Sequence, residues 1–334
     1  MRAREYGVLF ALALIWGISF LFIKIAVEDV SPATLVFGRL TLSVLTLALI
    51  AACRPALAAG WRRYLGYGLL IGTINNAIPF LLISWGETRI ASGVASILNA
   101  STPLFTVVLA QFWIGSAHES LTLRRSTGVL IGFLGVAVLI GPAAFNLGGG
   151  SMAQTLGELA VLIAAAAYAV GALMSKRYAG SAPLAAPLTM QAGALLVVTP
   201  VALLWDPPTH LPSLATFACI VELGVMGTAL AYLLYFWLIH HVGPTRTALV
   251  TYLLPCTALL WGMIFLGERV SWNSFAGLLL VLLGTMITNG TLNTQFARVR
   301  QLVRVTPQPV AVSVVALHDD SETDRLPEHS RITK

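Results

Sequence analysis

Residues 72–80 read Gly-Thr-Ile-Asn-Asn-Ala-Ile-Pro-Phe, and the stretch continues through Trp85 and Ser-Thr-Pro-Leu-Phe (101–105) to Gly115. It is almost wholly apolar, yet prolines, asparagines and a tryptophan stand where a helix facing lipid would carry leucine. The pattern returns 152 positions later without an insertion. The matched pairs are Gly72 and Gly224, Ala77 and Ala229, Leu81-Leu82 and Leu233-Leu234, Trp85 and Trp237, Pro103 and Pro255, and Gly115 and Gly267. The chain is therefore predicted to contain the same pair of membrane helices twice.

The composition indicates a membrane protein before any motif is considered. Apolar residues make up 57% of the 334 and charged residues only 10%, whereas a soluble domain carries about 25% charged residues. A helix needs about 20 mostly apolar residues to cross a bilayer, and the chain holds many such runs. We therefore predict an all-α integral membrane protein in contact with the lipid bilayer.

Neither the net charge nor the cysteines indicate a further ligand. The charge of +6 does not point to nucleic acid, because no basic patch is interleaved with aromatic residues. Cys53, Cys219 and Cys256 lack the spacing of metal ligands or of a disulfide framework. His240 and His241 have no third metal ligand spaced near them. No metal, cofactor or nucleic-acid partner is expected.

Ten apolar windows of spanning length follow one another along the chain. The expected fold is ten transmembrane helices arranged as two five-helix repeats, at residues 1–145 and 146–294, followed by a flexible cytoplasmic tail at 295–334. Because five is odd, the second repeat enters the membrane upside down, and inverted repeats are typical of secondary transporters. The windows fall near residues 6–25, 33–52, 65–85, 94–114, 126–142, 156–174, 186–204, 215–238, 246–266 and 272–290.

The basic residues set the expected orientation. With the N-terminus inside, the outer loops hold only Arg89 and Arg269, while Lys24 and Arg39 lie at the outer ends of spans. The positive-inside rule then places both termini in the cytoplasm and the protein in the cell's plasma or inner membrane. The basic residues on the cytoplasmic side would be Arg2, Arg4, Arg54, Arg62, Arg63, Arg124, Arg125, Lys176, Arg177, Arg246, Arg298, Arg300 and Arg304.

An ordered set of motifs covers residues 6–290. It comprises Trp16-Gly17, Lys24, Pro32, Arg39, Trp85-Gly86-Glu87, Ala95-Ser-Ile-Leu-Asn-Ala-Ser-Thr-Pro-Leu-Phe105, Gly115, Glu119, Gly128 and Gly135, and then a second copy with Pro255, Leu266-Gly267-Glu268, Gly277 and Gly284. This set resembles the EamA family of the drug/metabolite transporter superfamily. The resemblance implies ten helices around a central cavity that moves small organic solutes outward, often amino acids or related metabolites. It does not fix the solute.

Polar and aromatic side chains inside the spans are candidates for lining such a cavity. An amide or hydroxyl in hydrocarbon needs a partner, which is either another helix or a solute in a wet cavity. Aromatic rings deep in a span either wall a cavity or pack against helices and lipid. Both explanations stay open at this point. The candidates are Trp16, Asn75, Asn76, Asn99, Ser101, Thr102, Tyr168, Thr228, Tyr232 and Tyr252.

Three prolines are expected to break spans near mid-membrane, because proline removes a backbone donor from a helix. They are Pro79, Pro103 and Pro255. The match of Pro103 to Pro255 across the two copies predicts a pair of gating hinges. Gly128, Gly132 and Gly135 permit close helix approach, either inside the fold or on the face of a homodimer.

Arg39 and Glu222 are the charges expected inside spans, where an ionisable residue is a functional hypothesis by default. Arg39 is interpreted as snorkelling to the outer surface or pairing with Glu28 or Asp29, in preference to binding a substrate carboxylate. Glu222 has no counterpart, since position 70 is leucine. Its carboxylate could carry a coupling proton, or it could reach water.

The leading hypothesis is a secondary carrier that exports small metabolites. No Walker-type phosphate-binding loop is present, so ATP is not expected to be the direct energy source. The lack of a Gly-x-Ser-x-Gly motif, and of any aspartate within a span, speaks against an intramembrane enzyme. A channel and a non-transporting scaffold are the alternatives. The few charges within spans argue against polyanionic substrates such as nucleotide sugars.

Overall fold

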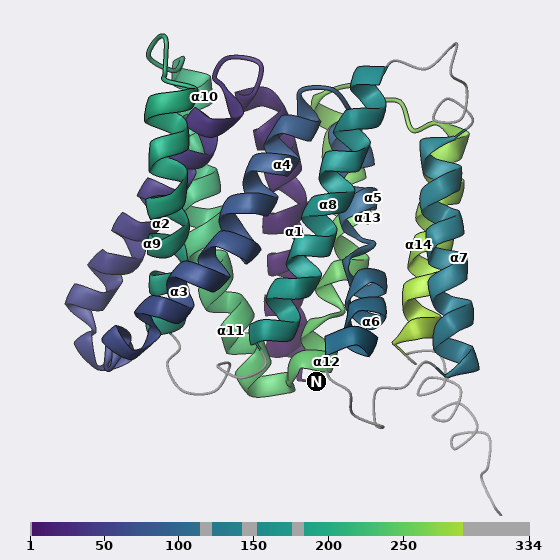
Figure 1. The fold of residues 1–334 in the computed structure, drawn as a ribbon, viewed down its shortest axis with the longest axis horizontal. Helices are drawn as coiled ribbons and strands as arrows, with labels where there is room; N and C mark the ends of the chain where they lie inside the picture. Colours follow the sequence, from purple (N-terminus) through teal and green to yellow (C-terminus); the bar gives the residue numbers. More distant parts are fainter. Residues whose placement is uncertain (1, 114–121, 142–151, 176–183, 290–334) are drawn as a thin grey trace, which may run out of the picture. The chain divides into compact units, whose positions relative to one another are not determined.

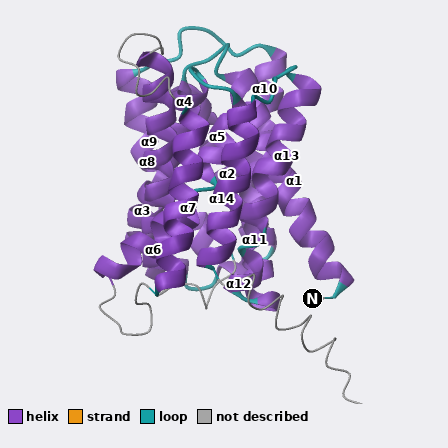
Figure 2. Ribbon diagram, turned by 90° about the vertical axis from the view of Figure 1, so that its right-hand side faces the viewer, coloured by secondary structure: helices purple, strands orange, loops and turns teal. Residues whose placement is uncertain are grey.

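The computed structural model describes residues 2–113, 122–141, 152–175 and 184–289. Helices and the turns between them fill these ranges, which contain no β-strand (Figure 1, Figure 2). The all-helical class predicted from the sequence is therefore confirmed for this part of the chain. The tail predicted at 295–334 lies outside the described residues, as do Lys176 and Glu119.

The first half of the chain consists of seven α-helices with short 3-10 and π segments between some of them. These elements are α1 (Ala3–Ala26), α2 (Pro32–Cys53), η1 (Pro55–Ala58), η2 (Trp61–Tyr64), α3 (Leu65–Gly72), η3 (Thr73–Ala77), α4 (Ile78–Glu87), α5 (Ser92–Asn99), α6 (Thr102–Trp113) and α7 (Leu123–Ile140).

The described part of the second half also contains seven α-helices. Its elements are α8 (Met152–Ser175), α9 (Ala185–Pro200), η6 (Val201–Trp205), α10 (Leu214–Val221), η7 (Glu222–Leu230), α11 (Ala231–Val242), α12 (Pro244–Thr247), α13 (Val250–Phe265) and α14 (Trp272–Thr288).

Eight helical segments in the described chain are long and apolar enough to cross a bilayer, and Val250–Phe265 and Trp272–Thr288 are apolar but shorter. Large apolar side chains also face outward: Leu130 is 71% and Leu196 65% exposed. Exposed apolar surface of this kind marks contact with lipid or with a partner. The structure is that of a multi-pass membrane protein.

Two of these segments contain π-helices at matching positions. η3 joins α3 to α4, and η7 joins α10 to α11. Thr73–Ala77 corresponds at the 152-residue offset to residues 225–229, which lie within η7. π-Helices are rare and are frequently found at functional sites, so this pair directs attention to the middle of both segments.

The prolines differ in what they do to the helices. Pro79 is the second residue of α4, directly after η3, and Pro103 is the second residue of α6, just after the break from α5. Pro255 lies inside a continuous α13. The expectation that Pro255 breaks its span is therefore wrong, because the interruption in that segment lies earlier, between α12 and α13. A gating role stays a prediction for all three.

Close packing of α7 on α14 depends on glycine. A Cβ atom on Gly284 would lie 2.5 Å from the carbonyl oxygen of Gly128, and a Cβ on Gly135 would lie 2.9 Å from that of Gly277. Neither separation leaves room for a methyl group. Gly128, Gly132 and Gly135 thus pack inside the fold against α14. A homodimer stays a prediction, and these three glycines do not form its interface.

We expect Gly284→Val to lower the free energy of unfolding by about 1–3 kcal/mol, the usual cost of overpacking a tight contact. The control is Gly7→Val in α1, where an added Cβ meets nothing within 4 Å. Thermal unfolding of the purified variants in detergent measures both. Equal melting temperatures for the two variants would contradict a glycine-dependent contact between α7 and α14.

Asp29, in the loop between α1 and α2, holds the segment that leads into α10. Its carboxylate accepts a hydrogen bond from the Ser213 backbone N–H at 2.8 Å and lies 3.3 Å from the His210 Nε2 atom. The pKa of Asp29 is lowered from its ordinary value, chiefly by a hydrogen bond from the Thr216 side chain and then by the Ser213 backbone. The ionised carboxylate therefore stabilises this connection.

A lowered pKa gives stability that is present above the unfolded-state pKa of about 3.9 and is lost as the pH falls toward the folded-state value. Wild-type protein is therefore expected to melt above Asp29→Asn at pH 7, with the difference shrinking as the pH drops below about 4. Melting curves between pH 7 and pH 3 test this. A difference that stays constant across that interval would contradict the assigned role of the carboxylate.

Candidate functional site

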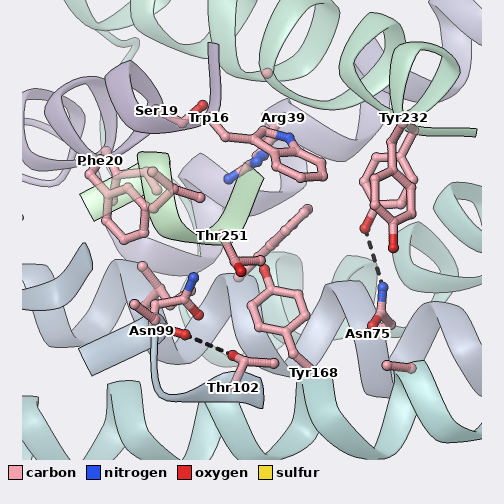
Figure 3. Close-up of a pocket in the computed structure, with 18 residues that line it drawn as sticks. Trp16, Ser19, Phe20, Arg39, Asn75, Asn99, Thr102, Tyr168, Tyr232 and Thr251 are labelled. Carbon is pink, nitrogen blue, oxygen red and sulfur yellow. Dashed lines mark hydrogen bonds between the residues drawn. The ribbon is translucent and has the colours of Figure 1, made fainter. Parts of the chain in front are cut away.

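A cavity of about 230 Å³ lies among helices from both halves of the chain. Figure 3 shows its wall, to which α1, α2, α8 and α11 each contribute side chains. Six of the predicted candidates line it: Trp16, Asn75, Asn99, Thr102, Tyr168 and Tyr232. The structure thus brings together residues that are spread over more than 200 positions of the sequence.

Aromatic rings form much of this wall. Trp16 lies edge-on to Tyr232, with ring centroids 6.3 Å apart, and 5.5 Å from the ring of Tyr235. Such offset and edge-to-face arrangements are the favourable ones for aromatic pairs. Phe20, Phe80 and Tyr168 extend the ring surface. An apolar or aromatic part of a solute would find complementary surface here.

The two asparagines of η3 have different roles: Asn76 positions another side chain, and Asn75 lines the cavity. Asn76 is fully buried, and its Oδ1 atom accepts a hydrogen bond of 2.8 Å from the Tyr232 hydroxyl. Asn75 lines the cavity and donates to the same hydroxyl at 3.3 Å. Both amides come from η3, so the π-helix sets the position of the Tyr232 ring. Asn76 does not reach the cavity itself.

The residues at the α5–α6 break satisfy their own backbone. The Ser101 hydroxyl donates to the Leu98 carbonyl at 2.6 Å, and the Thr102 hydroxyl donates to the Asn99 carbonyl at 2.7 Å. Ser101 is buried away from the cavity, whereas Thr102 and Asn99 line it. The Asn99 Oδ1 atom is buried and has no hydrogen-bond partner among the described residues.

Arg39 points inward. Its side chain is buried, its Nε atom donates to the Thr228 hydroxyl at 2.8 Å, and its guanidinium carbon lies 3.8 Å from the centroid of the Phe80 ring. The preference for snorkelling or pairing with Glu28 or Asp29 is therefore wrong. The fully buried Thr228 is the partner of Arg39, which accounts for its place among the candidates.

Glu222 and Tyr252 lie outside the set of lining residues. Glu222 opens η7, and its Oε2 atom is buried without a hydrogen-bond partner, 3.7 Å from where a Cβ of Gly227 would stand. Since Gly227 lines the cavity, this carboxylate adjoins the wall. The Tyr252 hydroxyl instead accepts from Asn289 at 2.8 Å and faces α14.

The profile of the EamA-like transporter family matches residues 4–141 and again residues 155–290. The chain belongs to this family. The resemblance noted in its sequence is thereby confirmed, and the protein is a membrane transporter.

Relatives of this EamA-like protein include named transporters. The uncharacterized inner membrane transporter YedA of Escherichia coli K12 is 28% identical over 81% of this chain and 87% of its own length. A probable amino-acid metabolite efflux pump of Salmonella typhimurium is 27% identical over 91% and 99%. A probable terminal-alkyne amino-acid exporter of Streptantibioticus cattleyicolor is 27% identical over 82% and 89%.

A solved structure shares the fold. A protein crystal structure superposes with a TM-score of 0.59 at 18% identity, and the match covers 89% of this EamA-like chain and all of the other.

Several residues of the site could have been found from the repeat. At the 152-residue offset Trp16 matches Tyr168, Phe80 matches Tyr232, Asn76 matches Thr228, and Arg39 matches Gln191. The first three pairs all lie in or directly behind the cavity wall. Ser19, Tyr235 and Thr251 also line the cavity. Tyr235 is one of the aromatic residues within the spans, whereas no sequence signal marks Ser19 or Thr251.

Two sets of hydrogen bonds close the end of the bundle that carries the α4–α5 turn. The Lys24 ammonium donates to the carbonyl of Glu87 at 2.6 Å and to that of Ile90 at 3.1 Å. The Glu268 carboxylate accepts from the backbone N–H groups of Ser92 and Gly93 at 2.8 and 3.1 Å. Lys24 thus ties α1 to this turn, and Glu268 ties the α13–α14 connection to α5.

We expect Tyr232→Phe to lower the free energy of unfolding by about 1–3 kcal/mol, because it removes the hydroxyl that satisfies buried Asn76. The matched control is Tyr235→Phe, since the Tyr235 hydroxyl has no hydrogen bond among the described residues although its ring also lines the cavity. Thermal unfolding in detergent compares the two. If Tyr235→Phe lowers the free energy of unfolding as much as Tyr232→Phe does, the hydrogen bonds from η3 do not fix the position of the Tyr232 ring.

Proposed function

We propose that this EamA-like transporter exports a small amino acid or a related metabolite across the cell membrane by alternating access. In this proposal ten spans form two inverted five-helix repeats, and both termini are cytoplasmic. The observation that carries it is the small cavity of mixed aromatic and amide character, enclosed by helices from both halves. A site between two halves can face either side of the membrane in turn as the halves rock.

The pattern of helix contacts supports the repeat. The first helix of the first half, α1, contacts α13 of the second half. Correspondingly, the first helix of the second half, α8, contacts α5 and α6 of the first half. The contact of α3 with α9 is likewise matched by that of α2 with α10 and η7. The fifth helices of the two halves, α7 and α14, contact each other. A two-fold relation between the halves produces this exchange of partners.

The size of the cavity supports a small solute. A volume of about 230 Å³ is below the roughly 300–1,000 Å³ of pockets that hold drug-sized ligands. The printed names of two relatives refer to amino-acid metabolites and to a terminal-alkyne amino acid. Both agree with an amino acid or a compound of similar size, and the aromatic wall favours an apolar side chain.

The hydrogen bonds at the α4–α5 turn support alternating access. The bonds of Glu268 tie the two halves together at this end of the bundle, since Glu268 belongs to the second half and Ser92 to the first. Opening that end requires the Glu268 carboxylate to leave the start of α5. A channel would not need such a closure, and a carrier requires one at each end in turn.

Counterflow in proteoliposomes tests the proposal. We expect saturable exchange of at least one apolar amino acid, tested with leucine, phenylalanine and tryptophan against a sugar control. Saturation together with stimulation by solute on the far side identifies a carrier, whereas flux that rises linearly with the gradient would identify a channel. No exchange of any amino acid by folded protein would overturn the assigned substrate.

The same proteoliposomes also test whether a proton gradient supplies the energy for transport. We propose that Glu222 carries a coupling proton, because its carboxylate adjoins the cavity wall and has a buried oxygen without a partner. Glu222→Gln is expected to abolish the effect of a pH gradient on net flux while exchange continues. The control is Glu28→Gln, at an exposed position. A pH effect that survives in Glu222→Gln would exclude this residue as the coupling site.

A further inference from the structure

We propose that Arg39 binds the carboxylate of the transported solute, so that a free carboxylate is what the cavity selects. The inference rests on the proposed function for the identity of the solute, and it assigns the group of the solute that the protein recognises. The chemical class it names is a monocarboxylate with an apolar or aromatic body, which includes the apolar amino acids.

Arg39 is a buried cation without an anion. Only 5% of its surface is exposed, and within the described residues no carboxylate lies within the 4.0 Å that defines an ion pair with it. Burying an unpaired charge is costly, and buried charges in proteins are generally paired. The other residues that line the cavity are uncharged. The carboxylate of Glu222 adjoins the wall but lies beyond ion-pair distance of Arg39. The lining itself therefore presents a single positive charge, which an anionic group of the solute would balance.

The guanidinium is held so that its far end stays available. Nε is used by the Thr228 hydroxyl at 2.8 Å, and one face of the group lies on the Phe80 ring at 3.8 Å. Thr228 is fixed in turn by donating to the Leu223 carbonyl within η7. The two terminal nitrogens of Arg39 donate no hydrogen bond to another of the described residues. These nitrogens are the pair of donors with which arginine binds a carboxylate in bidentate fashion.

The position that matches Arg39 in the second half carries no charge. Gln191 stands at the offset of 152 from Arg39 and is fully buried in α9. Its neutral amide is tolerated at the equivalent place in the fold. The charge of Arg39 is therefore a property of one half only, as recognition of a single anionic group requires.

The rest of the wall agrees with a solute that has one carboxylate. In Figure 3 Arg39 extends into the cavity from one side and Asn99 from another, with Thr251 between them in this view. The buried Asn99 Oδ1 atom has no donor and can accept an N–H group of the solute. The rings of Trp16 and Tyr232 offer apolar surface beside both. A second carboxylate would find no further cation on this wall.

Binding to the purified protein in detergent tests the assignment without relying on transport. The probes are phenylalanine, 3-phenylpropionate and phenylalaninamide, and the readout is the change in tryptophan fluorescence, to which Trp16 contributes from the cavity wall. We expect both carboxylates to bind, and the amide to bind at least about tenfold more weakly, because it cannot form the charge-assisted hydrogen bonds. Equal affinity for phenylalanine and its amide would overturn the proposal, as would failure of both carboxylates to bind.

Two variants separate recognition from folding. Arg39→Gln, which installs the amide of the second repeat, is expected to erase the preference for carboxylate over amide while melting as the wild type does. Arg39→Lys keeps the charge and is expected to keep part of the preference. An undiminished preference in Arg39→Gln would overturn the assignment. Carboxylate-selective binding without counterflow would instead contradict the proposed transport function and would leave the proposed role of Arg39 intact.

Discussion

A bilayer offers no hydrogen-bond partners in its hydrocarbon core, so every polar group within this chain must be satisfied by another part of the chain or by water in a cavity. This constraint accounts for the helices and also for how their polar side chains are used. Ser101 and Thr102 bond to the backbone that a break exposes, and Asn76 meets Tyr232 across two helices. Among the described residues, Asn99 Oδ1 at the cavity wall and Glu222 Oε2 beside it have no hydrogen-bond partner, and neither polar side-chain atom of the buried Gln191 has one. Only part of the unmet demand for hydrogen bonds therefore lies where a solute would supply them.

The sequence predicted the helices well, because a long apolar run has few other structures open to it in a membrane. The repeat also carries information about the cavity wall, since matched positions such as Trp16 and Tyr168 both line it. Where prediction failed, local position was misleading. Arg39 stands near the end of a span, but its direction is set by Thr228, 189 residues away, and nothing near Arg39 in the sequence shows this. Pro255 matches Pro103, yet only the segment containing Pro103 is interrupted beside its proline. Tyr252 is a cavity candidate as an aromatic residue within a span, whereas its hydroxyl faces α14.

The two halves resemble each other in backbone and differ in chemistry. Both contain a π-helix at the same place, and in both a buried polar side chain of that π-helix holds a cavity residue: Asn76 holds Tyr232, and Thr228 holds Arg39. The shared backbone gives the cavity two comparable walls. The different side chains on them give it a cationic side and a neutral side, and the proposed recognition of a carboxylate by Arg39 would give the solute one preferred orientation.

The glycine contact between α7 and α14 has a consequence for the symmetry of the pair of helices. It is reciprocal: Gly128 meets the backbone of Gly284, and Gly135 meets that of Gly277, while in the sequence Gly128 matches Gly277 and Gly135 matches Gly284. Residue i on one helix therefore meets j on the other, and the counterpart of i meets the counterpart of j, which is the signature of an isologous interface. The contact between α7 and α14 therefore has the symmetry of two copies of one helix, although both helices lie on a single chain. A substitution at any one of these four glycines is then expected to disturb the contact in the same way as a substitution at its counterpart.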